Sequence, residues 1–162
     1  ACTIGGNVAE NSGGVHCLKY GLTVHNVLEV EVLTIDGEWL TLGGRGLDAP
    51  GLDLLALMHG SEGLLGIVMQ VTVKLLPKPE LARVVLAAFD SVEAAGAAVA
   101  AIIAAGIVPG GLEMMDKLAI EVAEAYCHAG YPLDAAAILL CEVDGNAVDV
   151  DAQLEQVGAV LR

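Results

Sequence analysis

The motif Pro77-Lys78-Pro79 divides the chain into two stretches that differ in sequence rhythm. Proline fixes its own φ and has no backbone N–H, so closely spaced prolines end a strand or a helix. Before the motif, short β-branched segments alternate with glycine-rich turns, whereas longer alanine-rich segments follow it. We therefore place a domain boundary here and expect one domain over residues 1–79 and a second over residues 80–162.

The first domain is predicted to consist mainly of strands. Its expected strands cover residues 24–35, 38–42 and 67–76, because these segments are rich in β-branched residues or alternate with a period of two. Asp36-Gly37 is a typical hairpin turn between the first two strands. A short helix is expected over residues 52–59, and the glycine-rich stretch 1–20 is expected to form connected loops.

The second domain is predicted to follow the order strand, helix, helix, strand, helix. The expected strands cover residues 81–89 and 135–143, and the expected helices cover residues 90–105, 113–128 and 148–162. Asp90 and Glu93 have the spacing of a capping box at the start of the first helix. This order predicts an α+β layer with its helices on one side of an antiparallel sheet, so the whole chain is assigned to the α+β (α/β) class.

The charge of the chain excludes one class of function. The net charge is −14, from 21 acidic and 7 basic residues, and the bases are scattered. Nucleic-acid binding needs clustered Lys and Arg to neutralise phosphates, so we do not expect it. The mean hydropathy is high at +0.68, but the longest charge-free stretch, residues 94–112, is interrupted by glycines and Pro109. We therefore expect a buried helix there and not a membrane span, in a cytoplasmic protein.

The nucleophilic and metal-ligating residues form no recognisable catalytic or metal pattern. The four cysteines, at positions 2, 17, 127 and 141, include no Cys-x-x-Cys pair and are expected to be reduced structural thiols. The alternative of a reactive thiol is left open for Cys17, which follows His16 in a glycine-rich loop. No two of the four histidines are four residues apart, and no Gly-x-Ser-x-Gly motif occurs. We therefore predict no metal ligand and no catalytic residue in this chain.

Two glycine-rich runs are the candidate binding features. The first contains Gly5-Gly6 and Gly13-Gly14, and the second is Gly60-Ser61-Glu62-Gly63-Leu64-Leu65-Gly66. Glycine has no Cβ, so its backbone N–H groups can approach a ligand closely. The second run lies between a predicted helix and a predicted strand, which is the reverse of the order in a Rossmann dinucleotide motif. The residues alone therefore leave two alternatives, a purely structural turn or a ligand-binding turn on another fold.

Several runs, taken in order, resemble the FAD-binding domain of the vanillyl-alcohol-oxidase and p-cresol-methylhydroxylase superfamily. They are Thr3-Ile4-Gly5-Gly6-Asn7-Val8-Ala9, Asn11-Ser12-Gly13-Gly14, Tyr20-Gly21, Glu29-Val30-Glu31-Val32-Leu33, Asp36-Gly37-Glu38 and Gly60-Ser61-Glu62-Gly63-Leu64-Leu65-Gly66-Ile67. Residues 14–21 and 109–116 are similar to the branch that holds glycolate oxidase D subunits together with D-lactate and 2-hydroxyglutarate dehydrogenases. The resemblance implies that residues 1–79 are the second subdomain of the FAD-binding domain. It also implies that residues 80–162 begin the α+β cap domain, which covers the flavin.

The resemblance also implies which residues approach FAD, mostly through backbone groups. The implied residues belong to the two glycine-rich runs and are Thr3, Ile4, Gly5, Gly6, Asn7, Ala9, Gly13, Gly14, Glu62, Gly63, Gly66, Ile67 and Val68. Relatives often have a Thr-Leu pair where this chain has Leu64-Leu65, so one hydroxyl is absent here.

The implied activity is oxidation of a small 2-hydroxy acid by hydride transfer to FAD, with glycolate to glyoxylate first and D-lactate or D-2-hydroxyglutarate as alternatives. The implied partners are the other flavin and iron–sulfur subunits of a glycolate oxidase complex, through which the protein would associate with a membrane. The chain is expected to be an internal fragment, because the pyrophosphate loop and the histidine-rich segments of the family have no counterpart in it. We therefore expect it to hold FAD weakly and to be inactive alone, and a folded fragment that only self-associates is the alternative.

Overall fold

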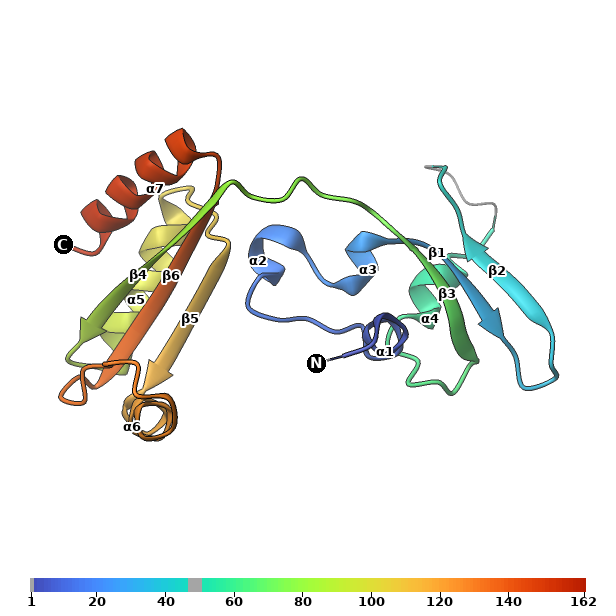
Figure 1. Cartoon of the computed structure of the whole chain (residues 1–162), viewed down its shortest axis with the longest axis horizontal. Coiled ribbons are helices and arrows are strands. Elements are labelled where there is room, and N and C mark those ends of the chain that lie inside the picture. Colours follow the sequence, from blue (N-terminus) through green and yellow to red (C-terminus); the bar gives the residue numbers. More distant parts are fainter. Residues whose placement is uncertain (1, 47–50) are drawn as a thin grey trace. The chain divides into compact units, whose positions relative to one another are not determined.

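The computed structural model describes residues 2–46 and 51–162, which form two compact units (Figure 1). The first unit comprises residues 1–17 and 21–77, and the second comprises residues 18–20 and 78–162. The described elements of the first unit are α1 (Ile4–Glu10), α3 (Thr23–Asn26), β1 (Val27–Leu33), β2 (Trp39–Gly43), α4 (Leu54–Met58) and β3 (Ile67–Val73). In the short helix α2 (Cys17–Tyr20), Cys17 belongs to the first unit and the other three residues belong to the second. Those of the second unit are β4 (Leu81–Phe89), α5 (Val92–Ala104), β5 (Gly111–Asp116), α6 (Lys117–Cys127), β6 (Ala137–Gly145) and α7 (Ala147–Val160).

The first unit is built on a three-stranded antiparallel sheet with the order β2-β1-β3. The predicted hairpin is confirmed, since β1 pairs with β2 from Glu29 opposite Gly43 to Leu33 opposite Trp39. Gly37 in the connecting turn has a φ of 81°, a value that glycine adopts without strain. The first strand begins later than predicted, because residues 23–26 form α3.

The core of the first unit lies on one face of this sheet. Val30 and Val32 alternate along β1 and are fully or almost fully buried, as expected of residues two apart on a strand. They pack with Val8 of α1 and Met58 of α4, which are also buried. The core therefore positions α1 and α4 against the same face of the sheet.

The prediction that residues 1–20 lack regular structure is wrong, because residues 4–10 form α1 and residues 17–20 form α2. Thr3 begins α1 by accepting a hydrogen bond from the Gly6 N–H, at 3.0 Å. Asn11 ends it in the left-handed conformation, with a φ of 47°. Two of the glycines that predicted a loop, Gly5 and Gly6, therefore lie in the first turn of a capped helix.

The second unit is built on another three-stranded antiparallel sheet, with the order β4-β6-β5. The predicted bounds of β4 are confirmed, and β6 is confirmed with its bounds shifted to Ala137–Gly145. Residues 111–116 form β5, whereas the sequence predicted a helix beginning at residue 113, so the true order alternates strand and helix throughout. This segment pairs with β6 along its whole length, and Asp116 then caps α6 by accepting from the Ala119 N–H. Backbone pairing and the cap thus outweigh the helical preference of its methionines.

The helices of the second unit cover both faces of its sheet, which corrects the prediction that they share one side. Helices α5 and α7 pack on the face that carries Leu139 and Cys141 of β6. Ile120 of α6 packs instead with Ile138, whose side chain points to the other face of the strand. Figure 1 shows α5 and α7 along the sheet and α6 near one end of it.

The start of α5 also differs from the prediction. Ser91, and not Asp90, is its N-cap, and the Ser91 hydroxyl accepts from the Ala94 N–H at 3.1 Å. Within the described part of the chain, none of the helices combines the length and apolar character that crossing a bilayer requires.

Candidate cofactor-binding site

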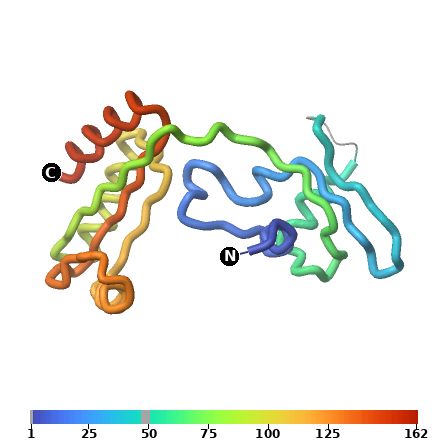
Figure 2. The backbone as a smooth tube through the Cα atoms, in the orientation of Figure 1, coloured from blue at the N-terminus to red at the C-terminus, as the bar shows by residue number. Residues whose placement is uncertain are grey.

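Helix α1 and the turn over residues 60–66 lie side by side in the first unit (Figure 2). The Gly60 N–H donates to the Val8 carbonyl at 3.0 Å, and the Glu62 N–H donates to the Ala9 carbonyl at 2.9 Å. Carbonyls near the end of a helix lack the usual partner one turn further along. The turn supplies a donor to the Ala9 carbonyl and a second donor to the Val8 carbonyl, which also accepts from the Asn11 N–H at 3.1 Å. These bonds join two glycine-rich runs that are far apart in the sequence.

The 60–66 turn has a backbone that few residue types can adopt. Glu62 has a φ of 52° and Gly63 a φ of 77°, both in the left-handed region. Gly66 has a φ of 157°, and a Cβ on it would lie 2.4 Å from the Val32 Cγ1. Glycine is therefore required at position 66 for the turn to meet the sheet.

The structure brings most of the predicted site residues together. Residues 3–9 and 62–68 are joined through α1 and β3, and Gly5 lies against the Val68 carbonyl, 3.5 Å from where its Cβ would be. The exposed members are Thr3, Ile4, Glu62, Gly63 and Ile67, and the half-buried ones are Gly5, Gly6, Asn7, Ala9, Gly66 and Val68. The two runs therefore present backbone and small side chains at one edge of the first unit.

Gly13 and Gly14 stand apart from this edge. Gly14 donates its N–H to the Cys17 Sγ at 2.9 Å, and a Cβ on Gly13 would lie 2.7 Å from the Leu22 Cδ2. Among the described hydrogen bonds, none links these two glycines to the 60–66 turn. Their place at a cofactor stays a prediction.

Two polar atoms, one in the turn and one in the residue before it, were not identified from the sequence. Among the described residues, the buried side-chain atoms without a hydrogen-bond partner are the His59 Nε2 and the Ser61 Oγ. The His59 Nδ1 lies 2.8 Å from the Leu55 carbonyl, and because a carbonyl oxygen can only accept, the Nδ1 is the donor of this bond. An unpaired buried polar atom costs about 1–3 kcal/mol, so the turn fits a ligand that brings both donors and acceptors.

The electrostatics of this edge favour recognition by backbone groups. Neither residues 2–16 nor residues 51–73 contain a lysine or an arginine. A phosphate would normally be held by such side chains or by a long helix N-terminus, whereas a neutral ring system needs only N–H and C=O groups. The residues present therefore fit the ring portion of a flavin better than its pyrophosphate.

The metal-ligating and thiol side chains are further candidates for a site. Among the described residues, no group of three or more His, Cys, Asp or Glu side chains is placed to hold an ion. All four cysteines are free; Cys141 is buried, Cys17 is half-buried, and Cys2 and Cys127 are exposed. Burial raises the pKa of the Cys141 thiol, which makes it less nucleophilic.

The fold is α+β, and the edge formed by α1 and the 60–66 turn presents backbone groups without a lysine or an arginine beside them. Comparison with known proteins identifies the family. Residues 1–43 match the family described as "FAD binding domain", and residues 78–162 match "FAD linked oxidases, C-terminal domain". The second match covers more than half of the chain, so the chain belongs to the FAD-linked oxidases, whose cofactor is FAD.

Individual relatives agree with this assignment. The chain is 68% identical over 161 residues to the glycolate oxidase subunit GlcD of Escherichia coli K12, covering 99% of this chain and 32% of the relative. It is 44% identical to GlcD of Bacillus subtilis, covering 99% of this chain and 34% of the relative. A D-lactate dehydrogenase of Anaerostipes hadrus is 34% identical, with 96% and 34% covered. The chain thus spans about a third of the length of the curated relatives it matches.

A solved structure shares the fold. An alkyldihydroxyacetonephosphate synthase aligns with a TM-score of 0.81 at 20% identity, covering 97% of this chain and 31% of that chain. At this identity the likeness shows the fold alone.

Proposed function

We propose that this chain forms one wall of the FAD site, and the beginning of the cap domain, of an oxidoreductase that oxidises small 2-hydroxy acids, with glycolate as the first substrate to test. The observation that carries the proposal is the docking of the 60–66 turn on α1, because it gathers residues 3–9 and 62–68 at one edge. The two relatives with the highest identity given above are named as glycolate oxidase subunits, which supports the choice of substrate.

When bound, FAD would accept the hydride from the α-carbon of the hydroxy acid, which is chemistry that no side chain can supply. The part of this chain would be orientation. Backbone groups of Gly5, Gly6 and Gly63 would approach the cofactor, since no Cβ keeps it at a distance. The exposed Ile67 and the half-buried Val68 would give the ring an apolar contact, and the His59 Nε2 and Ser61 Oγ would gain hydrogen-bond partners.

Titration of the isotope-labelled chain with FAD, followed by NMR, tests the binding part of the proposal. We expect weak, saturable shifts of the amide signals of Gly5, Gly6, Gly63 and Gly66, because this chain supplies only one wall. Gly5→Ala is the informative variant, since its Cβ would lie at an ordinary 3.5 Å from the Val68 carbonyl and the fold should persist. Gly96→Ala is the matched control, because a Cβ there meets nothing within 4 Å. The site would be contradicted if FAD caused no amide shifts in either glycine-rich run. It would also be contradicted if the FAD-induced shifts in Gly5→Ala equalled those in the unmodified chain.

A chimera tests the activity. The 161 aligned residues of the Escherichia coli relative would be replaced by this chain, and the hybrid assayed for bound flavin and for glycolate-dependent reduction of an artificial acceptor. We expect a flavin-loaded, active hybrid, and Gly5→Ala in it should lower the flavin content. A flavin-loaded hybrid that oxidises D-lactate but not glycolate would assign the other substrate of the branch. A hybrid without flavin would contradict the proposal.

The partners are proposed at a coarser level. Because the Escherichia coli relative is named as a subunit, we propose that the complete protein acts in a multi-subunit enzyme, with flavin and iron–sulfur subunits as the companions to look for. Purification of the tagged complete protein from its host, followed by identification of the bound polypeptides and their cofactors, would test this.

A further inference from the structure

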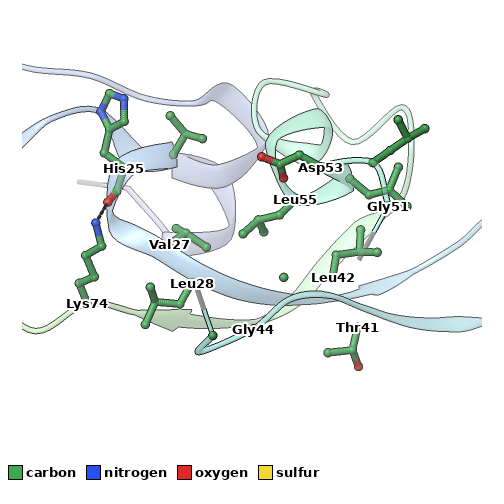
Figure 3. Close-up of a pocket in the computed structure, with 15 residues that line it drawn as sticks. His25, Val27, Leu28, Thr41, Leu42, Gly44, Gly51, Asp53, Leu55 and Lys74 are labelled. Carbon is green, nitrogen blue, oxygen red and sulfur yellow. Dashed lines mark hydrogen bonds between the residues drawn. The ribbon is translucent and has the colours of Figure 1, made fainter. Parts of the chain in front are cut away.

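The first unit contains a cavity that the proposed flavin site does not use. It has a volume of about 860 Å³, within the range of small-molecule sites. Its walls come from the start of β1, the end of β2, the start of α4 and Lys74, as Figure 3 shows. Residues 3–9 and 60–68 do not line it.

Lys74 is a positioned cation at this cavity. Its backbone N–H donates to the Asn26 carbonyl at 2.9 Å, and its ammonium group donates to the His25 carbonyl. In the described part of the chain, the ammonium forms no ion pair with a carboxylate. An ammonium has three donors, and the described residues accept one of them, which leaves two for an anion. This is unusual in a chain with 21 acidic residues and 7 basic ones.

The rest of the lining is mainly apolar or backbone. Val27, Leu28, Leu42 and Leu55 contribute apolar side chains, and Gly43 and Gly44 contribute bare backbone. Gly43 lies where larger residues are excluded, since a Cβ on it would be 2.4 Å from the Leu28 carbonyl and 2.8 Å from the Leu55 Cδ2. An inorganic phosphate would find one cation and few further donors here. A carboxylate with an apolar tail would find both a cation and an apolar wall.

Asp53 limits the charge that the ligand can carry. Its carboxylate lines the cavity and caps α4 by accepting from the Ala56 N–H at 2.9 Å. Figure 3 shows Lys74 and Asp53 on opposite sides of the cavity. A ligand with a carboxylate at each end would therefore bring one of them toward a like charge.

We propose that this cavity binds a small monocarboxylate with an apolar tail, the carboxylate on Lys74 and the tail against Val27, Leu28, Leu42 and Leu55. The proposal is independent of the flavin site, because the two share no lining residue.

A series of ligands with the same six-carbon chain tests the proposal on the unmodified protein. The isotope-labelled chain is titrated by NMR with hexanoate, hexylammonium, adipate and inorganic phosphate. We expect saturable shifts of the amides of residues 27–28, 42–44 and 74 with hexanoate, and binding at least about tenfold weaker for the other three. Equal affinity for hexylammonium, adipate or phosphate would overturn the proposal, as would shifts confined to other residues.

The variant Lys74→Met tests the role of the cation. We expect hexanoate affinity to fall about tenfold, the size of one charge-assisted hydrogen bond. Lys78→Met is the matched control, since Lys78 does not line the cavity and its loss should leave the affinity unchanged. Unchanged binding in Lys74→Met would overturn the proposal. If that variant fails to fold, the comparison of hexanoate with hexylammonium on the unmodified chain still decides the matter.

Discussion

At the scale of single residues, Gly66 fixes the junction between the 60–66 turn and β3. Its φ of 157° lies at the edge of the region that L side chains rarely adopt, and the Val32 Cγ1 occupies the space of a Cβ. Gly66→Ala should therefore destabilise the first unit by about 1–3 kcal/mol through overpacking. Urea unfolding measures this, with Gly14→Ala as the control, because a Cβ at position 14 meets nothing within 4 Å. Equal stability of the two variants would contradict the steric argument.

Asp144 is the centre of a polar cluster in the second unit. Its side chain is 5% exposed and accepts from the Lys19 ammonium at 2.5 Å and from the Tyr20 hydroxyl. Asp144→Asn should cost about 2 kcal/mol, because it leaves the lysine without its counter-charge. The exposed Asp151→Asn is the matched control. The free energy of unfolding of both variants is measured by thermal or urea unfolding. Equal values would show that the ion pair contributes nothing to stability.

The same cluster predicts a dependence on alkaline pH. Burial alone would lower the pKa of Lys19, but the hydrogen bond and charge of Asp144 outweigh it and raise that pKa above 10.5. The hydrogen bond to Asp144 also raises the pKa of Tyr20 above 10.0. A group whose pKa is higher in the folded state than in the unfolded state stabilises the fold at pH values below its unfolded-state pKa. For Lys19 and Tyr20, this stability is lost as the pH rises above about 10. The unmodified chain should therefore lose more stability than Asp144→Asn between pH 9 and 11.

Glu124 has a lowered pKa and therefore affects stability at acidic pH. The N–H groups of Tyr131 and Gly130 donate to its carboxylate at 2.9 Å or slightly more, and these bonds outweigh burial and lower its pKa below 4.5. A lowered pKa stabilises the fold above the unfolded value, and that stability is lost as the pH falls through the folded one. A carboxyl-carbon NMR titration should show Glu124 more than half ionised at pH 4.5. A midpoint at or above that value would contradict the geometry.

At the scale of elements, the start of α5 has two candidate N-cap residues, Asp90 and Ser91. Asp90 and Glu93 have capping-box spacing, yet the Ser91 hydroxyl accepts from the Ala94 N–H. Ser91→Ala should therefore cost about 1 kcal/mol, whereas Asp90→Ala should change the free energy of unfolding by less than about half of that. Equilibrium urea unfolding of both variants measures the difference. The reverse ranking would restore the cap predicted from the sequence.

Elements with strong periodicity could be predicted, and elements decided by distant partners could not. The bounds of β4 and the pairing of β1 with β2 follow from β-branched residues and one Asp-Gly turn. Helix α1 was missed because Gly5 and Gly6 oppose helix formation locally, and buried Val8 stabilises it only through the core. Strand β5 was missed because its partner strand, β6, lies about 25 residues further along the chain.

The candidate site shows the same limit. The resemblance named two glycine-rich runs, and the bonds from Gly60 and Glu62 to α1 join them as one edge. His59 and Ser61 could not be recognised from the sequence, since a polar residue in or beside a turn is ordinarily exposed. Only the packing shows that the His59 Nε2 and the Ser61 Oγ are buried without a hydrogen-bond partner among the described residues. The Lys74 cavity was equally hidden, because its walls come from segments up to 50 residues apart.

At the scale of the whole molecule, the division into two units predicts which part can fold alone. The second unit has its own sheet and two buried clusters, around Ile102 and Leu139 and around Ile120 and Ile138. Residues 78–162 expressed alone should therefore fold, even though they lack the segment 18–20.

NMR of this shorter chain tests the prediction at each residue. Amide signals of β4, α5 and α7 should match those of the intact chain, because their packing partners all lie within residues 78–162. Signals of residues 143–145 should move, since Asp144 loses its hydrogen bonds from Lys19 and Tyr20. The Gly110 signal should move as well, because Gly110 lies so close to the Asp144 carboxylate that a Cβ on it would be 2.6 Å from the Asp144 Oδ1. A collapsed spectrum would show that segment 18–20 is required for folding. An unchanged spectrum around Asp144 would show that the polar cluster does not form in the intact chain.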